Sequence, residues 1–166
     1  MILRLLAISI FSFVWIDSHA QANKIKSFSL NLGPEVSFIE TNLRKTHRVG
    51  YGASIKGEYT FGKHGSATIN TGLSYFEGKS TESILAIPVK AGARYYLGNF
   101  YAAGEAGVVF LSKYFNETRP VFSIGMGDKF RVGAGKVDIS LRQEFWVGNP
   151  NTISVAVLRV GYELGW

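Results

Sequence analysis

The sequence contains no cysteine, which excludes a disulfide framework, a thiol nucleophile and any cysteine-ligated metal. Charged residues are also scarce: Asp, Glu, Lys and Arg make up 18% of the chain, against about 25% in ordinary globular domains. Together with a hydrophobic content of 46%, this balance excludes an intrinsically disordered chain, which is poor in apolar residues and rich in charge. The 166 residues are enough for one domain.

Long hydrophobic runs are missing beyond the N-terminus. Residues 1–20 have the pattern of a secretory signal peptide: Arg4, an uncharged apolar run over 5–16, and the small residues Ser18 and Ala20 before a cleavage site. The run is too short for a membrane anchor, which needs about 20 apolar residues. We therefore expect a secreted protein whose mature part, residues 21–166, forms one domain and does not cross a membrane with helices.

The chain is basic, with a net charge of +6, and a basic balance can suit nucleic acid or an anionic membrane surface. No lysine and arginine block of the nucleic-acid type is present, because the densest basic stretch is only Arg44–Arg48. Nucleic acid is therefore not an expected partner.

The mature chain alternates apolar and polar residues with a period of two, which is typical of β-strands. In the first segment Phe28, Leu30 and Leu32 share one face, while Ser29 and Asn31 share the other, and seven similar segments follow. The predicted connections alternate between short glycine-containing turns and longer polar loops, with a shorter last loop: 62–65, 98–99 and 133–136 against 39–48, 77–83, 112–119 and 148–151. This pattern predicts an all-β fold, an eight-stranded antiparallel up-and-down transmembrane β-barrel closed by the last strand pairing with the first.

A soluble barrel of the lipocalin or avidin type is the alternative. The charged face, however, also carries most of the glycines, as a narrow lumen requires, and the aromatic residues of the apolar face fall into two belts, as expected at the two interfaces of an outer membrane. With both mature termini in the periplasm, the predicted lower belt is Phe28, Tyr59, Phe61, Tyr95, Phe100, Phe130, Tyr162 and Trp166. The predicted upper belt is Phe38, Tyr51, Tyr75, Phe110, Phe122 and Phe145.

Three residues depart from this pattern. Asp128 and Gln143 interrupt the apolar face; Asp128 lies near a strand end, where the cost is small, and Gln143 has no explanation in the sequence. Pro88 falls on the inward phase, where it removes a donor from the ladder of hydrogen bonds, so we expect a bulge or a rim position there.

Charged residues gather on the inward phase. The six basic and six acidic residues are Lys56, Lys90, Arg94, Lys129, Arg142 and Arg159, with Glu35, Glu58, Glu105, Asp138, Glu144 and Glu163. Buried charges must be paired, and eight strands leave room only for side chains. The sequence thus predicts an ion-pair network that plugs the lumen; a hydrated lumen in which the charges act independently is the alternative.

Several motifs resemble a known family. The strand Leu85–Val89, the run Arg94–Gly98, the glycine-rich Phe100–Glu105 and the end Val160–Trp166 are similar to the small outer-membrane β-barrel domain proteins of Gram-negative bacteria, often called the porin family. The resemblance covers essentially the whole mature chain. It implies a barrel inserted by the outer-membrane assembly machinery, with Trp166 as the terminal aromatic signal, and it says little about activity.

Catalytic groups are few. After residue 20 the only histidines are His47 and His64, which do not have metal-ligand spacing. An acyl hydrolase would need a histidine near a serine and an orienting acid; His47 is in the first long loop, and Ser80, Glu82 and Ser83 are in the next. We expect His47 to be a solvated loop residue, and we expect no catalytic residue, metal or cofactor.

The predicted function is that of a non-enzymatic outer-membrane barrel, either structural or acting through its loops, with a narrow channel and a lipid A-modifying enzyme as alternatives. The expected contacts are outer-membrane lipids and lipopolysaccharide, and the sequence identifies no surface partner. The basic and aromatic loop residues are the candidates for an anionic ligand, although they would also suit non-specific headgroup contacts: Arg44, Lys45, His47, Arg48, Lys113, Tyr114, Phe115 and Arg119.

Overall fold

The computed structural model describes residues 27–47, 49–79, 81–113, 116–149 and 151–165. The predicted signal peptide therefore lies outside the described residues, as do Arg48, Tyr114, Phe115 and Trp166. No helix among the described residues has the length and apolar character needed to cross a membrane.

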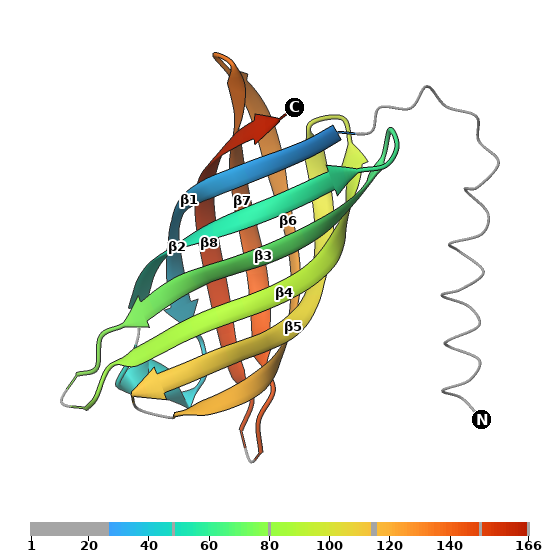
Figure 1. Cartoon of the computed structure of the whole chain (residues 1–166). Helices are drawn as coiled ribbons and strands as arrows, with labels where there is room; N and C mark the ends of the chain where they lie inside the picture. The colour runs from blue at the N-terminus through green and yellow to red at the C-terminus, as the bar shows by residue number, and fades with distance from the viewer. Residues whose placement is uncertain (1–26, 48, 80, 114–115, 150, 166) are drawn as a thin grey trace, which may run out of the picture.

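Eight antiparallel strands form a closed barrel (Figure 1). They are β1 (Ser27–Ile39), β2 (Val49–Thr60), β3 (Gly65–Phe76), β4 (Ile84–Leu97), β5 (Phe100–Lys113), β6 (Glu117–Val132), β7 (Gly135–Trp146) and β8 (Ile153–Gly165). Closure is made by β1 and β8, which pair from Ser29 opposite Gly165 to Ile39 opposite Val155. The predicted eight-stranded up-and-down barrel is thus confirmed.

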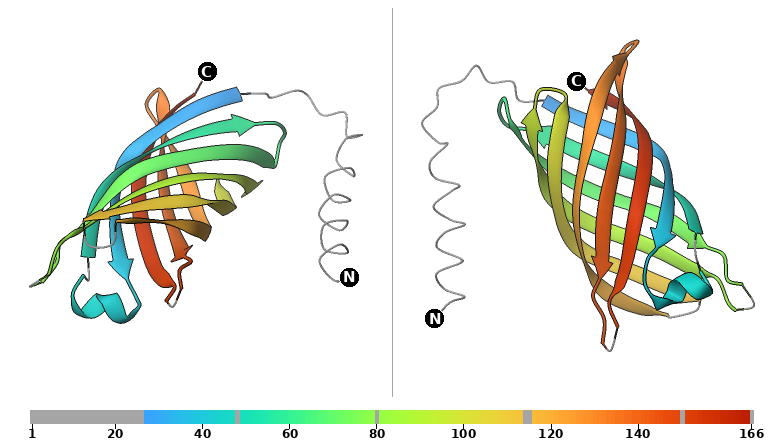
Figure 2. Two further views of the ribbon diagram at one scale, coloured as in Figure 1. Left: turned by 60° about the horizontal axis from the view of Figure 1, so that its bottom comes forward. Right: turned by 180° about the vertical axis from the view of Figure 1, so that it is seen from behind.

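The two ends of the barrel differ (Figure 2). One end, here the terminal end, holds the start of β1, the end of β8 and the short connections 61–64, 98–99 and 133–134. The other, here the loop end, holds the connections 40–48, 77–83, 114–116 and 147–152, and the first of these contains the 3-10 helix η2 (Asn42–Lys45). The predicted long third loop, 112–119, is wrong, because β5 extends to Lys113 and β6 already begins at Glu117.

The outer surface is apolar. Large side chains such as Leu32, Ile69 and Ile124 point outward and are more than 60% exposed. All described members of the two aromatic belts are exposed as well, with Tyr51 opposite Tyr75 at the loop end. A continuous apolar surface of this extent marks a contact with a membrane or a partner, and here it surrounds a charged interior, which is the polarity of a transmembrane barrel.

The inner surface has an apolar zone that the sequence analysis missed. At the loop end, buried hydrophobic residues pack together inside the barrel: Ile39, Phe76, Ile84, Ala86, Val109, Leu111, Val121, Trp146, Ile153, Val155 and Val157. We call this set the apolar plug. Phe76 and Trp146 meet edge to face at 5.9 Å between ring centroids. Leu43 of η2 packs against the plug from the first loop, so this loop covers the end of the barrel.

Pro88 lies inward without a bulge. Its pairing with Val109 continues the register of β4 and β5, so the predicted bulge is absent; Pro88 is the fifth residue of β4, toward the loop end of the strand. On the other side, the pairing of β3 and β4 skips from Thr71 opposite Val89 to Ser74 opposite Ala86. The ladder is interrupted there because proline has no N–H to donate.

The two polar residues on the outer face have different surroundings. The Gln143 amide donates hydrogen bonds to Ser154 Oγ at 2.6 Å and to Glu40 Oε2 at 2.8 Å. Gln143 is therefore not isolated but part of a small polar group at the loop end. Asp128 lies opposite Phe100, the first residue of β5, and is half-buried.

Candidate functional site

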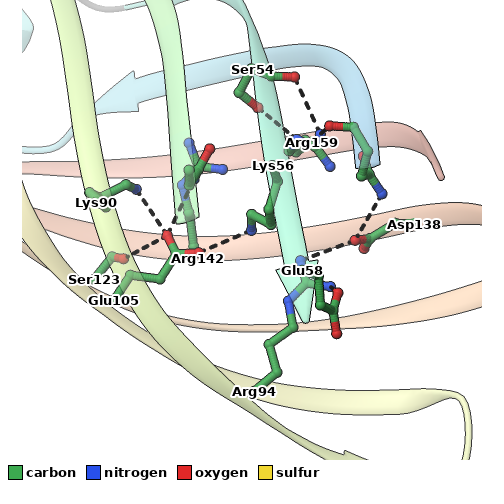
Figure 3. Close-up of polar contacts among 12 residues, drawn as sticks. Ser54, Lys56, Glu58, Lys90, Arg94, Glu105, Ser123, Asp138, Arg142 and Arg159 are labelled. Atoms are coloured by element: carbon green, nitrogen blue, oxygen red, sulfur yellow. Dashed lines mark hydrogen bonds and ion pairs between the residues drawn. The ribbon is translucent and has the colours of Figure 1, made fainter. Parts of the chain in front are cut away.

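All twelve charged residues predicted to line the lumen are buried inside the barrel. They come from every strand except β3, and β3 adds neutral partners: Ser66 donates to Glu58 at 2.6 Å, and Asn70 donates to Glu105 at 3.3 Å. Figure 3 shows eight of the charged side chains in the barrel interior, namely Lys56, Glu58, Lys90, Arg94, Glu105, Asp138, Arg142 and Arg159.

Seven of these residues form a chain of alternating charge in the middle of the barrel. Lys56 lies 3.1 Å from Glu105, which lies 3.3 Å from Lys90. Lys90 also pairs with Glu144. Arg142 contacts both Glu144, at 2.7 Å from its Nε, and Glu35, at 2.5 Å from its Nη2. Arg159 completes the chain at 3.8 Å from Glu35, and its Nε donates to Ser54 at 2.7 Å.

The other five residues form a second group nearer the terminal end. Arg94 contacts Glu58 at 2.9 Å and Asp138 at 3.1 Å. Lys129 contacts the same Glu58 at 2.9 Å and Glu163 at 2.5 Å. The central chain has four cations and three anions and this group has two cations and three anions, so the twelve side chains together carry no net charge.

Two tyrosines belong to the second group, although the sequence analysis did not single them out. Tyr101 donates to Asp138 at 2.6 Å, and its ring lies under the Arg94 guanidinium at 4.1 Å. Tyr96 donates to Glu58. The signal in the sequence was the inward phase of Tyr101, an aromatic residue on the polar face of its strand.

Several ion pairs cross the lumen. Arg94 on β4 reaches Asp138 on β7, and Lys129 on β6 reaches Glu58 on β2, although these strands are not neighbours in the barrel. A cavity beside Lys56, Glu105 and Arg142 measures about 10 Å³, which is room for about one water molecule.

His47 is not the solvated residue that the sequence predicted. The side chain is buried, its Nε2 lies 2.7 Å from the carbonyl oxygen of Glu82, and its Nδ1 lies 3.0 Å from Thr46 Oγ1. Because a carbonyl oxygen only accepts, Nε2 must carry the hydrogen. The neighbouring backbone adds a bond from Lys79 N–H to the Thr46 carbonyl at 2.8 Å. His47 therefore ties the first loop to the second.

The other candidate groups are dispersed. His64 is exposed in a turn at the terminal end, with Nδ1 2.9 Å from the Tyr96 carbonyl oxygen. Ser83 accepts a hydrogen bond from Tyr75, at 2.7 Å. Within the described residues, no group of three histidine, aspartate or glutamate side chains is placed to hold a metal ion.

The predicted loop candidates also separate. Lys113 is a strand residue, and Arg119 is an inward-facing strand residue, so neither is in a loop as predicted. Arg119 Nε lies 2.5 Å from Glu117, and Nη1 donates to the Asn151 carbonyl at 2.9 Å. Arg119 therefore ties the rim of β6 to the last loop.

A basic surface remains at the loop end. Arg44 and Lys45, both exposed in the last turn of η2, lie with Lys79 of the second loop around a cavity of about 410 Å³, together with Glu40 and Thr41. Lys79 was missed by the sequence analysis, because only the bond between the two loops brings it there. We call Arg44, Lys45 and Lys79 the loop-end basic cluster.

No protein-family model and no curated protein matches the chain, so the resemblance to the porin family is not confirmed. Solved structures do match. The attachment invasion locus protein Ail of Yersinia pestis has a TM-score of 0.56 at 17% identity, over 84% of this chain and 99% of that chain. Neisserial surface protein A has a TM-score of 0.64 at 12% identity, over 82% and 96%. The N-terminal barrel domain of Pseudomonas aeruginosa OprF has a TM-score of 0.51 at 14% identity, over 82% and 97%. These similarities show the fold, which is that of small outer-membrane barrels.

Proposed function

We propose that the chain is a non-enzymatic outer-membrane barrel that conducts no solute and acts through the surface at its loop end. The observation that carries this proposal is the filled lumen. Ion pairs cross it in the middle and toward the terminal end, and the apolar plug fills it at the loop end. A solute would have to break buried ion pairs and displace packed side chains, both of which are costly.

The proposed orientation puts the terminal end in the periplasm and the loop end outside the cell. It is supported by the short turns at the terminal end and the longer loops at the other, because outer-membrane barrels have short periplasmic turns and long outer loops. The loop-end basic cluster then faces the layer of lipopolysaccharide, whose phosphates are its proposed ligands.

A solved complex of a structurally similar protein also supports an anionic ligand. Ail of Yersinia pestis has been solved in complex with the heparin analogue sucrose octasulfate, a polyanion. At 17% identity this says nothing about the residues of the present chain, but sucrose octasulfate is a suitable probe for the loop-end basic cluster. A variant with Arg44→Gln, Lys45→Gln and Lys79→Gln should bind lipopolysaccharide and sucrose octasulfate more weakly in titration calorimetry.

Recording from planar bilayers tests the closed lumen. We expect no stable single-channel current from the folded protein, and large, long-lived currents would contradict the proposal.

Recovery in the outer-membrane fraction with heat-modifiable migration on gels tests the location. Lipid A analysis of a deletion strain tests the non-enzymatic assignment: a lipid A structure that changes with loss of the protein and returns with the wild type would favour the enzyme.

A further inference from the structure

The terminal end of the barrel opens into a cavity of about 740 Å³, which we call the terminal vestibule. Its wall includes residues of β1, β2, β6, β7 and β8 and of all three short turns at that end. Behind it, Lys129 with Glu58 and Glu163 closes the lumen. The terminal vestibule is therefore a pocket with one mouth, and a molecule inside it has no way through the barrel.

The charge of this wall is strongly one-sided. It contains four cationic side chains, Lys63, Lys129, Arg131 and Lys136, and one carboxylate, Glu163. Lys129 is held by two carboxylates at 2.9 Å and 2.5 Å. Lys136, whose side chain is 53% exposed, reaches Glu163 only at 3.9 Å.

Lys63 and Arg131 have no carboxylate within ion-pair distance among the residues that the structure describes. Together with Lys136, three cations from different segments thus surround the same space, and Glu163, the only carboxylate among the described residues of the wall, is already paired with Lys129. Positive charges around a concave site focus their field into it and raise the local concentration of anions.

We propose that the terminal vestibule binds a small soluble polyanion with at least two phosphate or carboxylate groups. Two such groups are needed because one monovalent anion would leave most of the excess charge uncompensated. The planar guanidinium of Arg131 suits an oxyanion, which it can bind through two parallel hydrogen bonds. Ser29, Thr60 and Asn99 also line the cavity and add neutral hydrogen-bonding groups. The volume lies in the range of about 300–1,000 Å³ that is usual for small-molecule sites.

A phosphate group could also come from a phospholipid headgroup at the membrane surface. The inward position of the cationic side chains favours a soluble ligand over a lipid headgroup. Arg131 is two residues beyond Lys129 on β6 and shares its inward phase, and both line the cavity with Lys63 and Lys136. A site for headgroups would instead place its cations on the outward phase, where at this end the structure has Phe28, Phe130 and Tyr162.

The test uses the protein extracted from the outer membrane in a neutral detergent and titrated calorimetrically with inorganic pyrophosphate and with citrate. The variant is Lys63→Gln, Arg131→Gln and Lys136→Gln together. The three substitutions are introduced into the triple variant of the loop-end basic cluster, here the parent, so that probe bound at the other end of the barrel does not contribute. We expect the vestibule variant to bind both probes about tenfold more weakly than the parent, given three exposed charge contacts.

The absence of binding by the parent at physiological salt would overturn the proposal, and so would unchanged binding when the three vestibule substitutions are added. If the vestibule variant does not fold, as judged by heat-modifiable migration, Arg131→Gln alone replaces its three substitutions and should still weaken binding. Repeating the titration in phosphatidylcholine nanodiscs with and without phosphatidylglycerol distinguishes the two sources of phosphate. Loss of pyrophosphate binding only with phosphatidylglycerol would assign the vestibule to headgroups and contradict the soluble ligand. Because the loop-end basic cluster is neutral in both the parent and the vestibule variant, the outcome is independent of the function proposed for the loop end.

Discussion

Arg94 Nη2 lies 3.1 Å from Asp138 Oδ2 across the barrel interior, and both side chains are inaccessible to solvent. The two strands that carry them, β4 and β7, are separated by two other strands on one side of the barrel and by four on the other. The ion pair therefore connects two sides of the barrel wall across the lumen. Tyr101 on β5 holds the second oxygen of Asp138, at 2.6 Å, so the carboxylate is fixed at both of its oxygen atoms.

Replacing Arg94 should strongly destabilise the barrel. Arg94→Ala leaves the buried Asp138 without its ion-pair partner and removes one of the two cations that pair with Glu58. Removing one member of a buried pair costs about 3–5 kcal/mol, and the Arg94→Ala, Asp138→Ala double variant should cost less than the sum of the two single variants. Urea unfolding from lipid vesicles measures both effects.

Lys136→Ala is the control for this prediction, because Lys136 is half-exposed and 3.9 Å from its partner. It should change the free energy of unfolding by no more than about 1 kcal/mol. Equal effects of Arg94→Ala and Lys136→Ala, or strict additivity in the double variant, would mean that the interior is hydrated and that its charges act independently.

The sequence predicts which side chains point inward better than it predicts what they contact. The phase of a strand depends on its own alternation, and no bulge shifts the register even at Pro88. The contact between Arg94 and Asp138, in contrast, depends on the stagger of strands that are distant in sequence, and no local pattern encodes it. The apolar plug was missed because neighbouring residues such as Phe145 and Trp146 are both apolar, so alternation disappears at the strand ends. The burial of His47 depends on the Glu82 carbonyl in another loop.

Trp146 tests the apolar plug. Trp146→Ala would remove a buried indole that packs on Phe76 and donates to Glu144 at 2.9 Å. Loss of a large buried aromatic side chain costs about 3–5 kcal/mol, whereas Phe145→Ala, on the lipid-facing side of the same strand, should cost clearly less. Similar losses for the two variants in urea unfolding would show that the loop end of the lumen is not a packed core.

His47 tests the connection between the first two loops. His47→Ala removes the bond to the Glu82 carbonyl, and we expect trypsin to cleave after Arg44 or Lys45 several-fold faster in the folded protein, because cleavage requires local opening of the loop. His64→Ala, in a turn at the other end, should leave cleavage at these sites unchanged. Unchanged cleavage in His47→Ala would show that other contacts suffice to hold the first loop in place.

Two glycines on opposite faces of neighbouring strands test how closely the barrel wall is packed. A Cβ added to Gly92, on the inner face of β4, would lie 2.1 Å from the Gly104 carbonyl oxygen and 2.7 Å from the Glu105 Cα. Neither atom can yield without moving the backbone, so Gly92→Ala should destabilise the barrel and lower the yield of folded protein. A Cβ on Gly104 would meet nothing within 4 Å, and Gly104→Ala should be neutral or stabilise by up to about 1 kcal/mol, since glycine weakens a strand by that amount relative to alanine. The heat-modifiable fraction and the urea midpoint measure both variants. If Gly92→Ala folded as well as Gly104→Ala, β4 and β5 would have to be less closely apposed than the structure has them, and the lumen correspondingly wider.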